Sequence, residues 1–222
     1  MQLVLASNNA KKLKELSALL APVSVELVTQ GSLGISEAEE PHITFIENAL
    51  AKARHAAAAS GLPAIADDSG LCVDALGGAP GVWSARYADV SAEVTLTAAE
   101  REAQRALQDE ANNAKLLAAL DALGQPERHA RFVCALVAVR HADDPQPLLA
   151  FGRWEGRIAR PAERRGSGGF GYDPLMFIPA LGATAAELPA DVKNAHSHRA
   201  LAAAEMLRQL DAAWSHLLRR PG

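Results

Sequence analysis

Short apolar runs alternate along the chain with longer segments in which apolar residues recur at helical spacing. The first run, residues 3–6, predicts a buried strand, and Ser7-Asn8-Asn9 supplies the turn and N-cap chemistry that begins a helix. We expect Pro22 to end that helix, and the alternating residues 23–28 predict a second strand. The apolar face of the helix consists of Leu13, Leu16, Leu19 and Leu20.

The next stretch predicts an acidic loop, a helix and a strand, in that order. Residues 29–42 are expected to form the loop. Thr44-Phe45-Ile46-Glu47 has the spacing of a capping box, so a helix is expected to begin there and to end near residue 60, where a glycine follows. Residues 63–66 predict a short buried strand that runs directly into an acidic turn, Asp67-Asp68-Ser69-Gly70.

The second half of the chain predicts a long helix followed mainly by strands. Residues 97 to about 123 predict a charged amphipathic helix, which Asn112-Asn113 can interrupt. Residues 132–139 and 148–154 predict paired strands, and residues 175–178 a short one. The stripe of the last helix is Leu207, Leu210, Trp214, Leu217 and Leu218. Strands that alternate with helices predict an α/β fold, and the paired strands make its sheet mixed.

Composition and charge narrow the class of protein. The 222 residues suit one large domain or two closely packed lobes, and 49% hydrophobic with 22% charged residues is ordinary for a globular chain. The net charge of -4 argues against binding of polymeric nucleic acid but permits a small anionic ligand. No apolar run approaches the roughly 20 residues that span a membrane. Cys72 and Cys134 make no disulfide framework, so we expect a reduced, cytoplasmic setting.

The first candidate site is the strand-to-helix junction Ser7-Asn8-Asn9-Ala10-Lys11-Lys12. Free backbone N–H groups and the helix dipole favour an anion there, and a lysine one turn into the helix can reach phosphate oxygens. The P-loop pattern is absent. The alternative is that Ser7 and Asn9 only cap the helix and that the lysines are solvated.

The second candidate site is a set of carboxylates, Glu37, Glu39, Glu40, Asp67 and Asp68. Mg²⁺ is usually held by one or two carboxylates together with substrate phosphates. Ligands of open α/β sheets gather at the ends of strands, where the adjacent aspartates are expected. The alternatives are a solvated acidic loop for the glutamates and a turn or helix cap for the aspartates.

Two further segments combine polar groups with flexible backbone. Residues 166–171 match G-x-G-x-x-G, but Pro174 and an apolar strand follow, so a dinucleotide site is rejected. The loop instead offers Phe170 for stacking on a base; the alternative is a plain glycine hairpin. Residues 193–199 contain His196 and His198, but two histidines without a third ligand nearby are only a weak signal for zinc. Contacts with a nucleotide are favoured for this segment, and the alternative is a capped helix start.

The order of these motifs resembles the Ham1/RdgB family of inosine and xanthosine triphosphate pyrophosphatases. The matching blocks are residues 6–12, Glu40, 44–49, 52–53, 66–71, 77–87, 169–174, Lys193 and 197–199. They cover nearly the whole chain. The resemblance implies a curved mixed sheet with flanking helices in two lobes around a central cleft, formed by a single domain over residues 1–222, and usually a homodimer.

The resemblance also implies roles for individual residues. Mg²⁺ would be held by Glu40 and Asp68, and Asp68 would also act as general base, leaving Asp67 as an auxiliary carboxylate. The triphosphate would contact Ser7, Asn8, Asn9, Ala10, Lys11, Lys12 and Lys52. Other substrate contacts would be Ser69, Phe170, Gly171, Tyr172, Asp173, Lys193, His198 and Arg199, with Phe170 stacked on the purine.

The implied reaction is hydrolysis of ITP, dITP, XTP or dXTP to the monophosphate and pyrophosphate. Two other classes stay open: a Maf-type pyrophosphatase for other nucleotides, and a nucleotide sensor without catalysis. The chain departs from the family pattern at Ser7-Asn8-Asn9, usually Thr-Gly-Asn, and at Pro41-His42, usually a small pair. The segment of residues 89 to about 112 is longer than is usual in the family, and we expect it to be a surface extension of a helix without a catalytic role.

Overall fold

The computed structural model describes residues 2–8, 10–21, 25–90, 98–124, 126–166 and 168–218. Its α-helices are α1 (Ala10–Leu20), α2 (Phe45–Ser60), α3 (Ala98–Asp121), α4 (Ala190–His196) and α5 (His198–Leu218). Its strands are β1 (Gln2–Leu5), β2 (Glu26–Thr29), β3 (Ala64–Val73), β4 (His129–Val139), β5 (Leu148–Ile158), β6 (Met176–Ile178) and β7 (Ala183–Thr184). Within the described ranges, no helix is both long and apolar enough to cross a lipid bilayer.

Seven strands form one sheet in the order β2-β1-β3-β4-β5-β6-β7. β1 runs parallel to β2 and β3, whereas β6 runs antiparallel to β5 and β7. The predicted α/β class with a mixed sheet is therefore confirmed, as is the pairing of β4 with β5. The chain divides into two compact units: Met1–Ser69, Val133–Arg153 and Asn194–Gly222 form the first, and Gly70–Phe132 and Trp154–Lys193 form the second.

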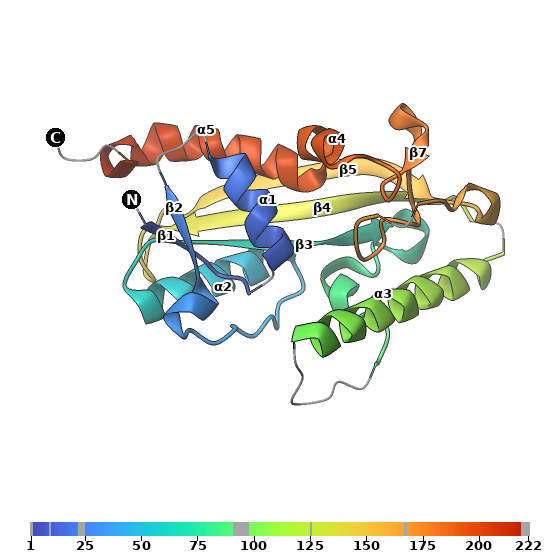
Figure 1. Cartoon of the computed structure of the whole chain (residues 1–222), viewed down its shortest axis with the longest axis horizontal. Helices are drawn as coiled ribbons and strands as arrows, with labels where there is room; N and C mark the ends of the chain where they lie inside the picture. The colour runs from blue at the N-terminus through green and yellow to red at the C-terminus, as the bar shows by residue number, and fades with distance from the viewer. Residues whose placement is uncertain are drawn as a thin grey trace. The chain divides into compact units, whose positions relative to one another are not determined.

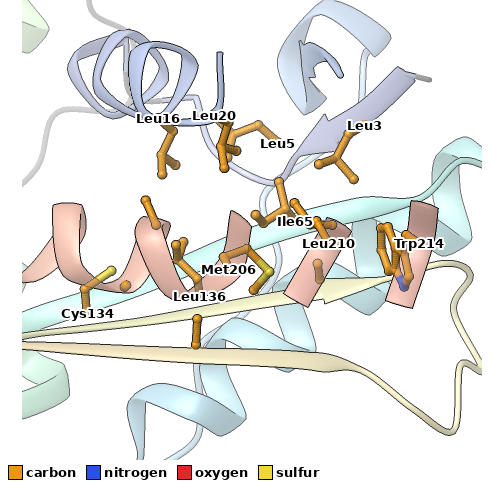
Figure 2. Close-up of a cluster of buried hydrophobic side chains, with 14 residues drawn as sticks. Leu3, Leu5, Leu16, Leu20, Ile65, Cys134, Leu136, Met206, Leu210 and Trp214 are labelled. Atoms are coloured by element: carbon orange, nitrogen blue, oxygen red, sulfur yellow. The ribbon is translucent and has the colours of Figure 1, made fainter. Parts of the chain in front are cut away.

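The first unit buries both faces of its strands, because successive side chains of a strand point to opposite sides. One face packs against α1 and α5 in the cluster shown in Figure 2, which includes Leu5, Leu16, Ile65 and Leu210. The other face packs against the alanines of α2. Figure 1 shows α1 and α5 on one side of these strands and α2 on the other. Each fully buried leucine contributes about 1.5–3 kcal/mol of burial free energy.

The second unit has its own core of apolar side chains around α3. Leu116 and Leu120 of α3 pack with residues of β3, β4, β5 and β6, including Leu71 and Ile158. The ring of Phe132 lies 6.4 Å from that of Trp154 in the same cluster. This core fixes α3 against the segment that contains residues 169–175, because Tyr172 and Leu175 also belong to it.

The ends of α2 follow the predicted capping signals. Thr44 Oγ1 accepts the N–H of Glu47 at 3.3 Å, and Gly61 ends the helix in the left-handed conformation, with φ 68°. These signals are local, so the boundaries of α2 could be predicted closely. α1 ends at Leu20 as expected, but Asn9, Pro22, residues 23–24 and residues 91–97 lie outside the described residues.

One prediction about an element was wrong, and one possible interruption of a helix does not occur. Asp67-Asp68-Ser69-Gly70 is not a turn after a short strand, since β3 continues through it to Val73. The strand continues because both carboxylates find cationic partners inside the fold, as described below. α3 continues through Asn112-Asn113, because these side chains bind other segments and do not compete for the helix backbone.

Candidate active site

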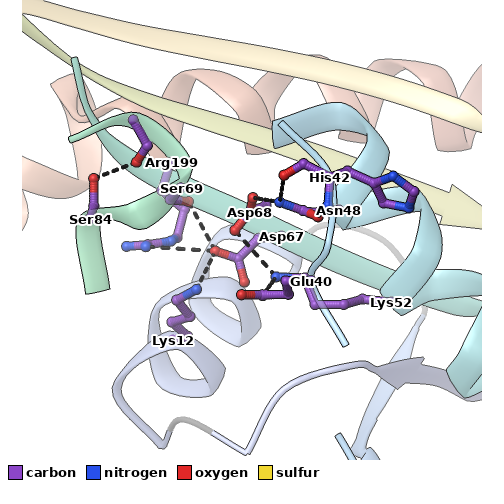
Figure 3. Close-up of polar contacts among 11 residues, drawn as sticks. Lys12, Glu40, His42, Asn48, Lys52, Asp67, Asp68, Ser69, Ser84 and Arg199 are labelled. Atoms are coloured by element: carbon purple, nitrogen blue, oxygen red, sulfur yellow. Dashed lines mark hydrogen bonds and ion pairs between the residues drawn. The ribbon is translucent and has the colours of Figure 1, made fainter. Parts of the chain in front are cut away.

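β3 places its two adjacent aspartates on opposite faces of the sheet. Ile65 of β3 belongs to the core beneath α1 and α5, and Asp67, two residues later, shares that face. Ala66 belongs to the core beneath α2, and Asp68 shares that face. Figure 3 shows the two carboxylates meeting different partners. The adjacent aspartates therefore occupy two separate electrostatic environments.

Asp67 is enclosed by cations. Its side chain is 1% exposed, and its Oδ2 lies 2.8 Å from Lys12 Nζ and 3.8 Å from an Arg199 nitrogen. Ser69 Oγ donates to the same oxygen at 3.0 Å. Burial alone would raise the pKa of Asp67, but the charges of Lys12 and Arg199 outweigh it and hold the pKa well below its usual range. Asp67 is therefore an ionised anchor for α1 and α5.

Arg199 links three elements of the first unit. It lies in the first turn of α5, is 4% exposed, and pairs with Glu15 of α1 as well as with Asp67. Burial lowers the pKa of Arg199, and the charges of Asp67 and Glu15 raise it further than burial lowers it. Sequence reasoning named Arg199 as a substrate contact but missed Glu15. The signal for Glu15 in the sequence was its position next to Leu16, on the apolar face of α1.

Asp68 and Glu40 converge on a single ammonium group. Lys52 Nζ lies 2.5 Å from Glu40 Oε1 and 3.3 Å from Asp68 Oδ1. Burial raises the pKa of Asp68 and Glu40 raises it further, so the pKa lies above its usual value despite the charge of Lys52. Burial lowers the pKa of Lys52, but Asp68, Asp67 and Glu40 together raise it above its usual value. The two carboxylates thus share a cation.

Asn48 holds the acidic loop against β3. Its side chain accepts the His42 N–H at 3.0 Å, donates to the His42 carbonyl at 3.1 Å and donates to Asp68 Oδ2 at 3.3 Å. His55, two turns further along α2, contacts the carbonyl of Ser36 at 2.9 Å. Sequence reasoning missed Asn48 and His55, although Asn48, Lys52 and His55 have the spacing of one helix face. These contacts fix the loop shape at Pro41-His42, which the sequence left open.

The predicted phosphate loop lies at the end of β1 and the start of α1. The N–H of Ser7 donates to the Leu5 carbonyl at 2.8 Å, and Asn8 Nδ2 donates to Glu37 Oε1 at 3.1 Å. Ala10 and Lys11 lie in the first turn of α1, but their side chains are outside the described atoms. Lys12 points toward Asp67. The structure therefore brings Lys12, Lys52, Glu40, Asp68 and Ser69 together in the first unit.

The predicted base-binding loop lies in the second unit. Asp173 Oδ2 accepts from Lys193 Nζ at 2.6 Å and from the Phe170 N–H at 3.2 Å, which closes a short turn. Gly169 has a φ of 80°, which favours glycine, and a Cβ there would also displace the Asp173 carboxylate, 2.0 Å from its Oδ2. The ring of Phe170 is 36% exposed, whereas Tyr172 is buried with its hydroxyl donating to the Ser84 carbonyl at 2.9 Å. Phe170 is thus the aromatic residue of this loop that remains available.

The start of α5 lies directly on β5. Ser197 Oγ accepts the N–H of Ala200 at 3.2 Å, so Ser197 caps α5. This agrees with the alternative interpretation of residues 193–199 as a capped helix start. A Cβ on Gly152 of β5 would lie 1.9 Å from the His198 carbonyl oxygen. Gly152 therefore permits the close approach that places His198 and Arg199. Its signal in the sequence was a glycine inside a strand pattern, which sequence reasoning did not use.

The donor set indicates what kind of metal could bind. In the part of the chain that the structure describes, no cluster of three or more His, Cys, Asp or Glu side chains could hold a metal ion. A zinc site from protein ligands alone is therefore not formed by those residues. The pair Glu40 and Asp68 does suit Mg²⁺, because Mg²⁺ takes one or two carboxylates and completes its shell with phosphates and water.

Comparison with known proteins finds relatives over nearly the whole chain. The profile of the Ham1 family matches residues 3–209. A dITP/XTP pyrophosphatase of Leptothrix cholodnii is 70% identical over 214 residues, which cover 96% of this chain and 99% of that protein. A HAM1 protein of Coxiella burnetii has a solved structure with a TM-score of 0.84 and 42% identity, covering 96% of this chain and 100% of that one. The solved structure of the Ham1 protein of Staphylococcus aureus has a TM-score of 0.77 and 34% sequence identity, covering 96% of this chain and 99% of that one. The chain belongs to the Ham1 family.

Proposed function

We propose that the protein hydrolyses non-standard purine nucleoside triphosphates, namely dITP, ITP, XTP and dXTP, to the monophosphate and pyrophosphate. The observation that carries the proposal is the convergence of Glu40 and Asp68 on one cation, in the same unit as Lys12. The name of the Leptothrix cholodnii relative, dITP/XTP pyrophosphatase, supports the substrate class.

Mg²⁺ is the metal that we propose for Glu40 and Asp68. The ammonium group of Lys52 already occupies a position where it contacts both carboxylates, so the pair is arranged to hold positive charge. When bound, the metal would neutralise phosphate charge and lower the pKa of a water molecule. Lys52 would then be free to turn from the carboxylates to the phosphates of the substrate.

The residues of the chain divide the remaining tasks. The N-terminus of α1 offers backbone N–H groups and a positive dipole to the triphosphate, and Lys12 and Lys52 would stabilise the leaving pyrophosphate. Asp68 would accept the proton of the water that attacks the α-phosphorus in line. Asp67 would serve indirectly, by holding Lys12 and Arg199.

Selection of the base would depend on stacking and on donors to the 6-keto oxygen. Phe170 would stack on the purine, while Lys193, His198 and Arg199 would supply hydrogen-bond donors. An adenine amino group would leave such donors unpaired, which is a costly mismatch. Ser69 donates to Asp67, so any contact of Ser69 with substrate would use the lone pairs of its hydroxyl or its backbone.

We also propose that the whole chain acts as one enzyme domain and assembles as a homodimer in the cytoplasm. Cys72 and Cys134 form no disulfide in the part of the chain that the structure describes, which agrees with a reducing compartment. Light scattering after size exclusion would test the assembly, and a monomer mass would reject the dimer.

The function is tested by a pyrophosphate-release assay with ITP, XTP, ATP and GTP, each with and without Mg²⁺. We expect release from ITP and XTP that requires the metal and greatly exceeds release from ATP. Equal hydrolysis of ATP and ITP would reject the proposed selectivity. Recovery of every nucleotide intact would favour a sensor, and a preference for other nucleotides would favour the Maf-type alternative.

A further inference from the structure

Two side chains of α3, one helical turn apart, bind the backbone of the same residue in the aromatic loop, Gly171. Asp109 Oδ2 accepts the N–H of Gly171 at 2.8 Å. Asn113 Nδ2 donates to the carbonyl of Gly171 at 3.1 Å. Together, Asp109 and Asn113 form what we call the Gly171 clamp. The clamp joins residues 62 and 58 positions apart in sequence, and all of them belong to the second unit.

The clamped glycine is the neighbour of the exposed ring. Gly171 follows Phe170 directly and adopts a left-handed backbone, with φ 61°. Within the turn, Asp173 accepts the N–H of Phe170 and binds Lys193, and Tyr172 donates to the Ser84 carbonyl. The clamp therefore holds the loop from α3 at the residue next to Phe170. Because Asp109 is a carboxylate, its bond to the Gly171 N–H is charge-assisted and stronger than a neutral one.

α3 is itself fixed in rotation, so it can serve as a rigid support. Asn112 is 2% exposed and accepts the Ala88 N–H at 2.7 Å. Its amide also donates to the Ser84 carbonyl at 3.2 Å. Leu116, one turn further, is buried in the core of the unit. With Asn112 and Leu116 held, Asp109 and Asn113 are presented on the neighbouring stripe of the helix.

We propose that Asp109 and Asn113 are positioning residues that hold Phe170 where it stacks on the purine, and so determine affinity for the base. The proposal rests on the proposed function, because it needs a nucleotide substrate. The proposal gives one face of α3 a part in substrate recognition. Asp109 lies within residues 89–112, which were expected from the sequence to be a surface extension without a catalytic role. The clamp acts on the base and leaves the phosphate and carboxylate residues of the first unit untouched.

The test compares Asp109→Ala and Asn113→Ala with a matched control, Glu110→Ala. Glu110 is an exposed acidic residue beside Asp109, so its removal changes the same charge without touching the loop. For each variant, we would measure KM and kcat for ITP, and the inhibition constant of inorganic tripolyphosphate. Tripolyphosphate carries the phosphate chain without a base, so it reports on the phosphate site alone.

We expect each clamp variant to raise KM for ITP about tenfold, the size of the effect of losing base–aromatic stacking. The kcat and the inhibition constant of tripolyphosphate should stay within about threefold of wild type, and Glu110→Ala should change nothing. Asp109→Asn keeps one acceptor oxygen and should restore KM to near the wild-type value. The double variant should resemble the worse single one, because both groups hold the backbone of one residue, Gly171.

Three results would overturn the proposal. KM for ITP could stay at the wild-type value in a folded clamp variant. KM and the tripolyphosphate constant could rise together, which would indicate general loosening and no role in base binding. Wild-type protein could also fail to release pyrophosphate from ITP, which would reject the proposed function itself. The first two results, with active wild-type enzyme, would reject the clamp alone. Circular dichroism would show whether each variant is folded, and Asn113→Ala would decide the case if Asp109→Ala does not fold.

Discussion

Asp67 and Asp68 differ because the backbone of β3 turns them to opposite faces of the sheet. Asp67 meets Lys12 and Arg199, and Asp68 meets Lys52 and Asn48. The sequence indicates that both belong to a site, but their separation follows from a strand that continues past the acidic pair. The strand can continue because cations from three helices, α1, α2 and α5, pair with the two carboxylates.

Asp67→Asn should destabilise the folded protein. It would leave Lys12 and Arg199 facing an uncharged group in a buried environment, and we expect the free energy of unfolding to fall by about 3 kcal/mol. Thermal unfolding without nucleotide measures the change. Asp68→Asn is the matched control: burial raises the pKa of Asp68, so its charge costs stability, and the Tm of this variant should equal or exceed that of wild type. The opposite order of Tm values would contradict the assignment of Asp67 as the anchor.

Asn48→Ala should weaken the response to Mg²⁺ without removing a proposed ligand. Asn48 holds both the loop that contains Glu40 and the carboxylate of Asp68. Residues that orient metal ligands typically change metal affinity by about 10–100-fold. The Mg²⁺ concentration that gives half-maximal pyrophosphate release should therefore rise about tenfold or more. An unchanged half-maximal concentration in a folded Asn48→Ala variant would show that the loop is held by other contacts.

At the scale of elements, local signals predicted the structure better than distant ones. Thr44, Glu47 and Gly61 fixed the bounds of α2, because capping involves neighbours in sequence. The length of β3 and the unbroken course of α3 could not be predicted, since both depend on partners far along the chain. Asn112, for example, binds Ser84 and Ala88, which lie 28 and 24 residues away.

The turn between β4 and β5 should make the stability of the fold depend on acid. Asp144 is buried and accepts from the side chain of Arg140, at 2.8 and 2.5 Å, and from two backbone N–H groups. The Arg140 hydrogen bonds hold the pKa of Asp144 well below its usual value. A lowered folded-state pKa gives stability that is complete above the unfolded pKa of about 4 and is lost as pH falls below it.

Asp144→Asn should therefore lower the Tm at pH 7, by the equivalent of about 1–3 kcal/mol for lost hydrogen bonds to a charged group. The difference from wild type should shrink at pH 3, where the wild-type carboxylate loses part of its advantage. Asp143→Asn is the control, because Asp143 is the exposed neighbour in the same turn. A Tm difference that is equal at both pH values would show that the charge of Asp144 contributes nothing.

At the scale of the whole molecule, the proposed tasks divide between the two units. Lys12, Glu40, Lys52 and Asp68 lie in the first unit, and the loop with Phe170 lies in the second. The order of motifs was enough to predict the family and the mixed α/β fold. It could not identify Asn48, Asp109 or Asn113 as supports, because an asparagine or aspartate on a helix has no distinct signal until its distant partner is known.

Single-turnover and steady-state release of pyrophosphate from ITP by Asp68→Asn, at saturating Mg²⁺, tests the central claim most directly. Losing the proton acceptor and a proposed metal ligand should lower kcat by at least about 100-fold. The melting curve should show a folded protein. A folded Asp68→Asn variant that turns over ITP at the wild-type rate would contradict the account, because the site would then not depend on Asp68.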